Sequence, residues 1–406
     1  MSFVGTTINK NDGGLGQGKS VDRVAALIVG MDATDLLPNN KAFELLRIED
    51  AEALGINSSS DEASGVLVYE HLSEVFRLSP DTTIYLITVP VTTKASDLKN
   101  LDELIAAIKS INDINTIAIA GLTADLSVES AVGGTQLLVD MLTEQHILID
   151  VILLEGLGNY IKGEVATYPN LREMNAPNIS VIIGQDAEVA ARNKKFSNYS
   201  AIGSALGMLM VRSAHENLGS VDIENKPRKR KGENDYTLSD NKLSKFLSAN
   251  LSNGTAFSML SLADQKKLDE LGYIYIGAFA GYGGMFFSGS HTCTNKDSDY
   301  CYIERNAIWN KAARIIRKVL IPRVRSKVES DPSTGFIKHT TITDWDGRVR
   351  SALENMVASG NISAFDIYID PNQAAVSDAP FMVRVHLVAN GIVHEFEIDL
   401  GYTSKL

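Results

Sequence analysis

Short, unbroken apolar runs alternate with amphipathic helical patterns along residues 24–279, and this alternation constrains the fold more than any other feature of the sequence. An unbroken apolar run predicts a strand that is buried on both faces, as in a parallel sheet. Strands that alternate with helices predict a largely parallel sheet covered by helices, which is an α/β fold. The predicted strands are 24–29, 83–89, 116–119, 147–154, 179–183 and 273–279, and the helical patterns cover 101–108, 128–142 and 202–218.

The C-terminal part differs in kind and predicts an α+β unit. An amphipathic helix is expected over 346–359, and alternating apolar residues over 365–369 predict a strand. Two further alternating runs, 382–388 and 392–398, flank the dipeptide Asn390-Gly391. Asn-Gly between such runs is a strong hairpin signal, so an antiparallel hairpin is expected there.

The length of 406 residues allows two or three domains. We expect an N-terminal arm over 1–20, an α/β domain over 21–285 and a C-terminal unit over 286–406, with a subdivision near 220–235 left open. The formal net charge of −12 argues against a protein that binds nucleic acid over a broad surface, and the basic run 226–232 is interpreted as an exposed loop. No run reaches the ~18 apolar residues of a membrane helix, and no signal-peptide pattern opens the chain. Cytoplasmic synthesis without direct membrane insertion is therefore expected.

A long amphipathic helix is predicted before Pro322, which should end or kink it. Its apolar residues recur at steps of three and four and share one face, and cations occupy the opposite side. Such a cationic stripe is either a solvated face or a contact surface for an acidic partner. The apolar residues are Ile308, Ala312, Ile315, Ile316, Val319 and Leu320, and the cations are Lys311, Arg314, Arg317 and Lys318.

Residues 13–20, with the sequence GGLGQGKS, satisfy the pattern of a nucleotide-binding phosphate loop. Lys19 would reach the outer phosphates, the Ser20 hydroxyl would bind Mg²⁺, and Asp150 after an apolar run could assist the metal. That loop requires a strand before it and a helix after it, whereas the run after Ser20 is typical of a buried strand. A coincidental match is favoured, and a P-loop-type nucleotide hydrolase is kept as the alternative function.

No other catalytic, cofactor or metal site emerges from the sequence. His291, Cys293 and Cys301 offer three zinc ligands without the close cysteine pairs of a structural site. The loop that begins at Asn295 lacks the glycine and glutamate of a calcium-binding loop. There is no serine nucleophile elbow and no paired-histidine zinc motif. The sequence therefore predicts no enzyme, no cofactor and no metal, and leaves open whether the two cysteines pair.

The ordered features along the chain resemble those of the contractile tail sheath proteins of bacteriophages and contractile injection systems. The likeness is a pattern of segments over the whole chain and not one short motif. Upstream, it includes the opening FVGTTINKNDGGLG, then LLRIEDAEALGI and VYEHLSEVFRLSPDTTIYLITV. Downstream, it includes GYGGMFFSGSHT, DYCYIERNAIWNKAARIIRKVLIP, DGRVRSALENMVASGNIS, FMVRVHLV and VHEFEIDLGY.

The resemblance implies a structural polymer that assembles as stacked six-fold rings around an inner tube and contracts to drive the tube through a target envelope. In this family, a conserved domain combines the C-terminal part with the N-terminal segment, and an α/β domain is inserted between them. The arms add strands to neighbouring subunits, a form of β-augmentation. The inter-subunit strand candidates carried over to this chain are Phe3, Val4, Ile8, Val393, Phe396 and Ile398.

The family's long helix faces the inner tube, often through complementary charge. The resemblance thus makes Lys311, Arg314, Arg317 and Lys318 candidate tube contacts, together with Arg323 and Arg325 beyond the proline. Further expected partners are further copies of the chain, baseplate proteins and terminal cap proteins. The expected location is a phage tail or an injection particle.

Overall fold

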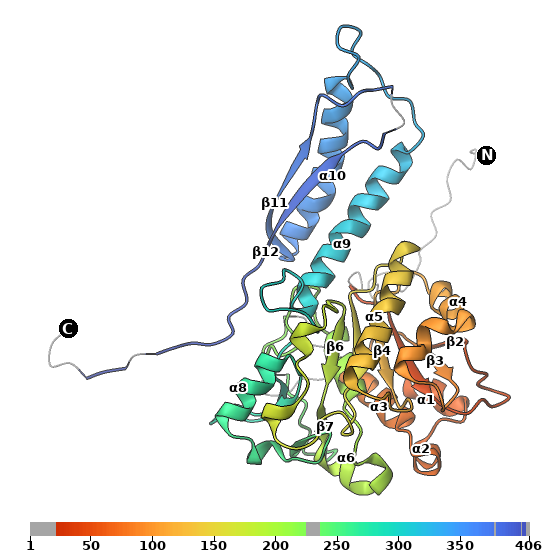
Figure 1. Ribbon diagram of the computed structural model, residues 1–406, viewed down its shortest axis with the longest axis vertical. Coiled ribbons are helices and arrows are strands. Elements are labelled where there is room, and N and C mark those ends of the chain that lie inside the picture. The colour runs from red at the N-terminus through yellow and green to blue at the C-terminus, as the bar shows by residue number, and fades with distance from the viewer. Residues whose placement is uncertain (1–21, 225–235, 377–378, 399, 403–406) are drawn as a thin grey trace, which may run out of the picture.

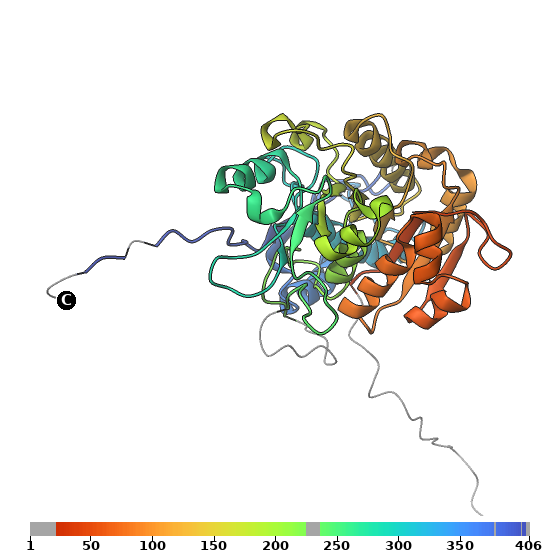
Figure 2. The same cartoon turned by 90° about the horizontal axis from the view of Figure 1, so that it is seen from below.

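The computed structural model describes residues 22–224, 236–376, 379–398 and 400–402. Figure 1 shows a broad α/β body, an elongated lobe of two helices and two strands above it, and a C-terminal segment that runs away from both. Figure 2, seen from below, shows the same C-terminal segment leaving the side of the body. The chain therefore presents two packed units and one extended arm.

A doubly wound sheet forms the centre of the body, with the order β2-β3-β1-β4-β5-β6. All neighbours are parallel except β2, which pairs antiparallel with β3 at the edge. The central strands are apolar and buried along their length, which explains why their sequence does not alternate. The strands are β1 Ala25–Gly30, β2 Ala42–Leu45, β3 Ile84–Val89, β4 Thr116–Ala120, β5 Val151–Glu155 and β6 Ile179–Ile182.

Helices cover both faces of this sheet. On one face, α3 (Val68–Leu78) and α7 (Ile202–Met210) pack on one set of alternate strand residues. On the other face, α4 (Asp102–Ser110) and α5 (Val128–Glu144) pack on the other set. The remaining body helices are α1 Ile48–Ala53, α2 Ser58–Ser64, α6 Ala187–Arg192 and α8 Leu262–Leu271, with 3-10 turns at η2 Ala95–Asn100, η3 Val165–Thr167, η4 Leu171–Glu173, η5 Lys194–Phe196 and η6 Phe257–Met259.

Helices α3 and α7 approach so closely that only glycine fits at one crossing point. A Cβ atom at Gly203 would lie 2.2 Å from the carbonyl oxygen of His71. The Gly203 amide donates a hydrogen bond to Nδ1 of His71, at 3.2 Å. The side chain of His71 is therefore an acceptor in its neutral form, and burial lowers its pKa to about 4.

The elongated lobe has its own core between two helices and a two-stranded sheet. Helix α9 (Ile303–Leu320) continues through the 3-10 turn η7 (Ile321–Arg323), and α10 (His339–Ala358) packs against it. Strands β11 (Ile362–Ile369) and β12 (Val383–Ala389) pair antiparallel and pack on both helices. Two short antiparallel pairs lie in the body: β7 Gly184–Asp186 with β8 Ala249–Leu251, and β9 Ile276–Gly277 with β10 Phe286–Phe287.

The predicted alternation of strands and helices is confirmed, as are the long helix and an α+β end. Several bounds differ: the strand expected over 147–154 begins at Val151, the helix expected over 202–218 ends at Met210, and α10 begins at His339. The run expected over 273–279 keeps only Ile276–Gly277 in a strand. Strand β2 was not predicted, because it is short and carries a glutamate.

The hairpin predicted around Asn390-Gly391 is wrong. The run before it forms β12, but β12 pairs with β11 and not with the run after it. Residues 392–398 have no strand pairing within the described residues and extend away from the lobe. The turn signal marks the end of β12, while the pairing is decided by the apolar core beneath β11.

Candidate inter-subunit site

Helix α9 belongs to both units of the structure. At its start, Ile303 is buried in the core that covers one face of the body sheet. One and a half turns later, Ile308 and then Ala312 are buried in the core of the elongated lobe. One continuous helix thus connects the two units without a linker.

A polar cluster ties α9 to the amino-terminal edge of the body sheet. Asp150, just before β5, accepts hydrogen bonds from Nδ2 of Asn310 at 2.9 Å and from Nη1 of Arg314 at 3.2 Å. The Arg314 guanidinium also donates to the carbonyl of Leu148, at 3.1 Å. Lys311 donates to Asp22, just before β1, at 2.7 Å. Lys311 and Arg314 therefore form largely buried ion pairs with carboxylates of the same chain.

Burial dominates the electrostatics of this cluster. The Asp150 side chain is 2% exposed, and its burial raises the pKa although Arg314 acts in the opposite direction. The neighbouring Arg23 is also buried, which lowers its pKa against the attraction of Asp150 and Asp22. Among the described residues, no hydrogen-bond acceptor contacts the Arg23 guanidinium. Asp150 is thus the principal counter-charge for two arginines.

The remaining cations lie on the surface. Arg317 is exposed, and Lys318 is 71% exposed, with its ammonium 3.6 Å from the carboxylate of Asp113. Arg323 lies 3.9 Å from Asp344, and Arg325 is exposed. A pair of this kind at the surface contributes about 0–1 kcal/mol, so these cations remain available to another molecule.

The position of Asp150 also contradicts its role in the nucleotide alternative. Asp150 precedes β5 at its amino end, whereas ligands of doubly wound sheets bind beyond the carboxyl ends of the strands. Its carboxylate is occupied by Asn310 and Arg314. Residues 13–20 lie outside the described residues, as do Phe3, Val4, Ile8 and the basic run 226–232.

The backbone is closely packed at the place where doubly wound sheets usually bind ligands. The strand order reverses between β1 and β4, and a Cβ atom at Gly30 would lie 2.5 Å from the carbonyl oxygen of Gly121. A Cβ atom at Gly121 would lie 2.2 Å from Cγ1 of Val66. The nearby cavity of about 230 Å³ contains Glu155, whose carboxylate accepts hydrogen bonds from the amides of Gly121 and Ser200. Burial raises the pKa of Glu155 to about 7.

The described residues contain no group of three or more potential metal ligands. Cys293 and Cys301 are buried free thiols, and burial raises the pKa of both, that of Cys293 to about 12. A thiol with such a pKa is a poor nucleophile. Within the described residues, no helix is long and apolar enough to cross a membrane.

The C-terminal arm, residues 391–402, exposes a row of apolar side chains. Within the described residues, no hydrogen bond joins the arm to the rest of the chain. Its apolar residues lie at every second position, so an extended backbone would place them on one face. The row consists of Phe396 (79% exposed), Ile398 (79%), Leu400 (94%) and Tyr402 (fully exposed), and Val393 before it is 67% exposed.

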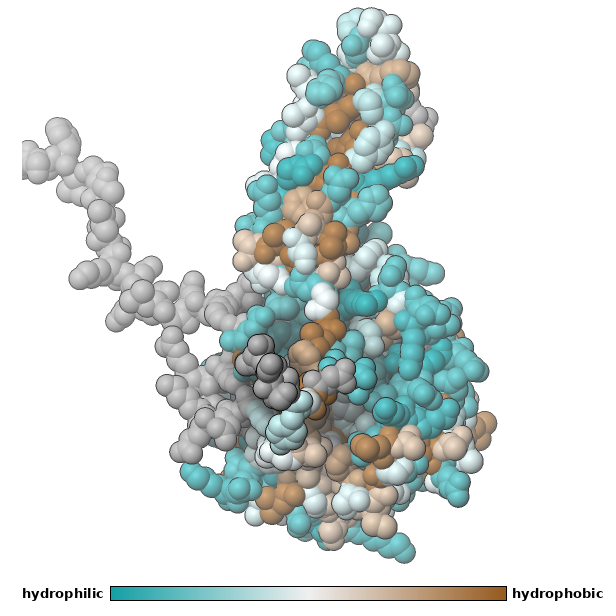
Figure 3. Space-filling view, turned by 90° about the vertical axis from the view of Figure 1, so that its left-hand side faces the viewer, coloured by the Kyte–Doolittle hydropathy of each residue, from teal (hydrophilic) through white to brown (hydrophobic). Residues whose placement is uncertain are grey.

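An unpaired strand edge and an apolar groove lie on the elongated lobe. Within the described residues, strand β12 pairs on one side only, with β11. A groove of about 760 Å³ runs between β12 and α9, and its lining includes Ile308, Trp309, Ile316 and Val385. Figure 3 shows hydrophobic side chains along this lobe. Trp309 was not singled out in the sequence, although its exposure of 47% on a packed helix marks it as a surface residue with apolar contact area.

The chain is similar to known families and to several solved structures. Two family models match, described as "DUF2586, N-terminal domain" over residues 4–291 and "DUF2586, C-terminal domain" over residues 299–406. Among solved structures, the helical sheath of the anti-feeding prophage in its contracted state is similar over 100% of both chains, with 14% identity and a TM-score of 0.62. No curated protein matches the chain by sequence.

Two further solved structures have the same fold. The contracted sheath complex of the extracellular contractile injection system PVC covers 100% of this chain and 98% of its own, at 12% identity and a TM-score of 0.58. The sheath tail protein from Desulfitobacterium hafniense covers 95% of this chain and 100% of its own, at 9% identity and a TM-score of 0.53. The resemblance to sheath proteins is therefore confirmed at the level of the fold, along the whole chain.

Proposed function

The chain belongs to the DUF2586 family and has the contractile-sheath fold along its full length, and from this premise we propose that it is a structural subunit of a contractile sheath. Copies of the chain stack as rings around an inner tube, and contraction of the stack drives the tube through a target envelope. Energy for contraction is stored in the extended lattice and not taken from a nucleotide.

The observation that carries this proposal is the exposed apolar row of the C-terminal arm. Its apolar row has no cover within the described residues, and a fold with a packed core does not retain such a row without a partner. The unpaired edge of β12 and the groove beside it offer both backbone hydrogen bonds and apolar contact to an added strand. In the assembly, the arm of one subunit adds to this edge on a neighbour.

The solved structures that share the fold are described as sheath and baseplate assemblies. This description supports self-association and contact with a baseplate as partners of the present chain. The six-fold ring, the inner tube and the terminal cap are further parts of the proposal. The location that follows is a phage tail or an injection particle.

Contact with the inner tube is assigned to the outer cations of α9 and the turn after it. Arg317, Lys318, Arg323 and Arg325 are exposed or half-exposed. Lys311 and Arg314, also candidates by resemblance, are 23% and 21% exposed and bind Asp22 and Asp150. Their role in the proposal is to hold α9 on the body, while the outer cations meet an acidic tube surface.

A structural role, and not catalysis, is the proposed activity of the α/β body. The close packing of Gly30 on Gly121 supports this, since the cavity beside them, of about 230 Å³, is smaller than the ~300–1,000 Å³ of typical ligand pockets. The nucleotide hydrolase is disfavoured, because Asp150, the carboxylate that could assist its metal, is bound to α9.

The alternation within the arm provides a matched test of the proposal. Replacement of Phe396 and Ile398 by Ser removes apolar contacts from one face of the arm, whereas replacement of Glu395 and Glu397 by Ser changes the other face. Sedimentation velocity at increasing protein concentration should show large particles for the wild type and the glutamate variant, and single subunits for the apolar variant. Equal assembly by both variants would refute the role of the arm.

A further inference from the structure

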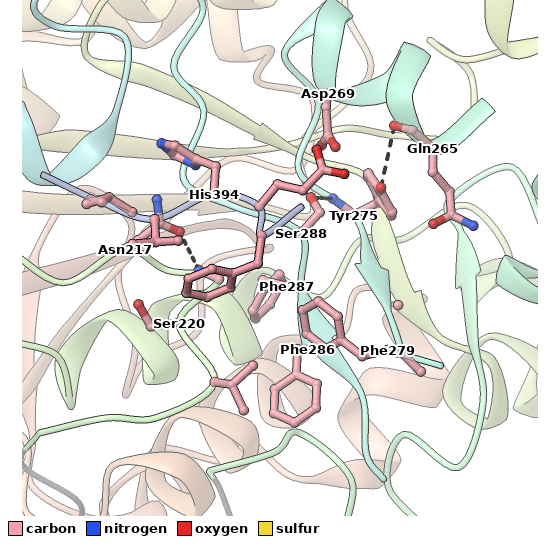
Figure 4. A pocket seen from close by; sticks show the side chains of 18 of the residues that line it. Asn217, Ser220, Gln265, Asp269, Tyr275, Phe279, Phe286, Phe287, Ser288 and His394 are labelled. Carbon is pink, nitrogen blue, oxygen red and sulfur yellow. Dashed lines mark hydrogen bonds between the residues drawn. The ribbon is translucent and has the colours of Figure 1, made fainter. Parts of the chain in front are cut away.

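An aromatic groove lies in the body beside the base of the C-terminal arm. It has a volume of about 650 Å³, and its floor is formed around β9 and β10. Figure 4 shows Phe286, Phe287 and Tyr275 on this floor and Phe279 at its side. Phe279 is 56% exposed, although its ring lies 5.9 Å from that of Phe286. Phe279 thus presents an exposed ring at the side of the groove, whereas Phe286, Phe287 and Tyr275 are buried beneath it.

The arm itself forms one wall of the groove. Residues 392–396 line it, and His394 stacks on Tyr302, with ring centroids 5.1 Å apart and planes inclined by 24°. Tyr302 is the residue before α9, so the stack fixes the base of the arm to the junction of body and lobe. Beyond His394, the arm has no stacked ring or hydrogen bond within the described residues.

The position of this stack places the apolar row within reach of the groove. Phe396 lies two residues beyond His394 and already lines the groove at its rim, although it is 79% exposed. The seven residues from Phe396 to Tyr402 span about 20 Å when extended. The start of the row therefore lies beside the aromatic groove.

We propose that the groove formed by Phe257, Tyr275, Phe279, Phe286 and Phe287 is a resting site for the chain's own C-terminal arm. In the free subunit, Phe396 and Ile398 occupy the groove, and the arm is withheld from other subunits. During assembly, the arm leaves the groove and pairs with a neighbour. This inference rests on the proposed function for its second step only, since the folded-back arm is a property of the single subunit.

Such a site would limit unwanted association of the free subunit through the exposed apolar row. An exposed apolar segment in extended conformation promotes association with any free strand edge, including wrong ones. Docking one aromatic ring against others contributes about 0.5–1.5 kcal/mol beyond its buried area. A contact of this size holds the arm for most of the time and still yields to a strand partner, which adds backbone hydrogen bonds.

The test uses the full-length chain at a concentration where it is monomeric. Chymotrypsin cleaves after Phe396, and mass spectrometry measures the rate at which this C-terminal fragment appears. The variant Phe279→Ser removes an exposed ring from the groove without loss of a buried side chain. Leu126→Ser is the matched control, because Leu126 is 95% exposed and does not line the groove.

The proposal predicts that Phe279→Ser is cleaved about tenfold faster than the wild type, which corresponds to about 1.4 kcal/mol. The control should be cleaved at the wild-type rate. Equal rates for Phe279→Ser and the wild type would overturn the resting site, whatever the protein assembles into. If rates differ as expected but no concentration gives particles, the resting site stands and the sheath function fails.

Discussion

Asp150 offers the sharpest test of how the two units are joined. Asp150→Asn keeps the shape of the side chain and removes its charge, which leaves Arg314 and the buried Arg23 without their principal counter-charge. Removal of one member of a buried pair costs about 3–5 kcal/mol. Because Arg314 is still 21% exposed, we expect a loss near the lower end, about 3 kcal/mol.

Urea unfolding measures this loss of stability, and tryptophan fluorescence assigns it to one of the two units. Trp309 and Trp345 both lie in the elongated lobe, so their fluorescence reports on that unit, while far-ultraviolet circular dichroism reports on the whole chain. The wild type should show coincident transitions, and Asp150→Asn should move the fluorescence transition to lower urea. Asp113→Asn is the control, because Asp113 also pairs with a cation of α9 but is 67% exposed. A shift for Asp150→Asn no larger than the control's would show that Asp150 does not hold α9 on the body.

Three further predictions follow from particular contacts. Gly203→Ala places a methyl group 2.2 Å from the His71 carbonyl oxygen and should destabilise the protein by about 3 kcal/mol. Gly133→Ala, on α5 with no atom within 4 Å of the added methyl group, should stabilise the protein by about 1 kcal/mol in the same urea titration. Similar values for both variants would contradict the packing of α3 on α7. Burial lowers the pKa of His71 to about 4, so its contribution to stability is present above pH 6.5 and is lost as pH falls towards 4. His71→Asn should remove this part of the pH dependence of the free energy of unfolding. An unchanged dependence between pH 6.5 and 4 would contradict this assignment. Reversal of charge at Arg317 and Lys318 should weaken co-sedimentation with the tube protein and leave ring assembly intact, and undiminished binding would exclude these cations as tube contacts.

The α/β part of the fold was readable because its signal is local. Strands β1, β3 and β4 are buried on both faces, so each is an unbroken apolar run. Helices between them repeat their apolar residues at helical spacing. The edge strand β2 has only its last residue buried and gives no such signal.

Pairing over long distances could not be predicted in the same way. The Asn390-Gly391 signal is strong, yet β12 pairs with β11, because both strands cover the core made by α9 and α10. The segment after Gly391 also alternates like a strand, and we expect its pairing partner to be another subunit. Local sequence predicts that a segment is a strand, and the available apolar surface decides where it pairs.

The candidate site could be predicted only in part, because helical spacing is a local signal and ion pairing across the fold is not. Helical spacing placed Lys311, Arg314, Arg317 and Lys318 on one side of a helix, and they are on α9. Their division into two inner and two outer cations depends on Asp22 and Asp150, which are far away in the sequence and reach α9 only through the fold.

Electron microscopy of the full-length protein, produced together with the proteins encoded beside it and concentrated, tests the central claim most directly. A sheath subunit should form hollow cylinders with a regular transverse striation, and deletion of residues 392–406 should abolish them. Compact single particles at every concentration would contradict the sheath function.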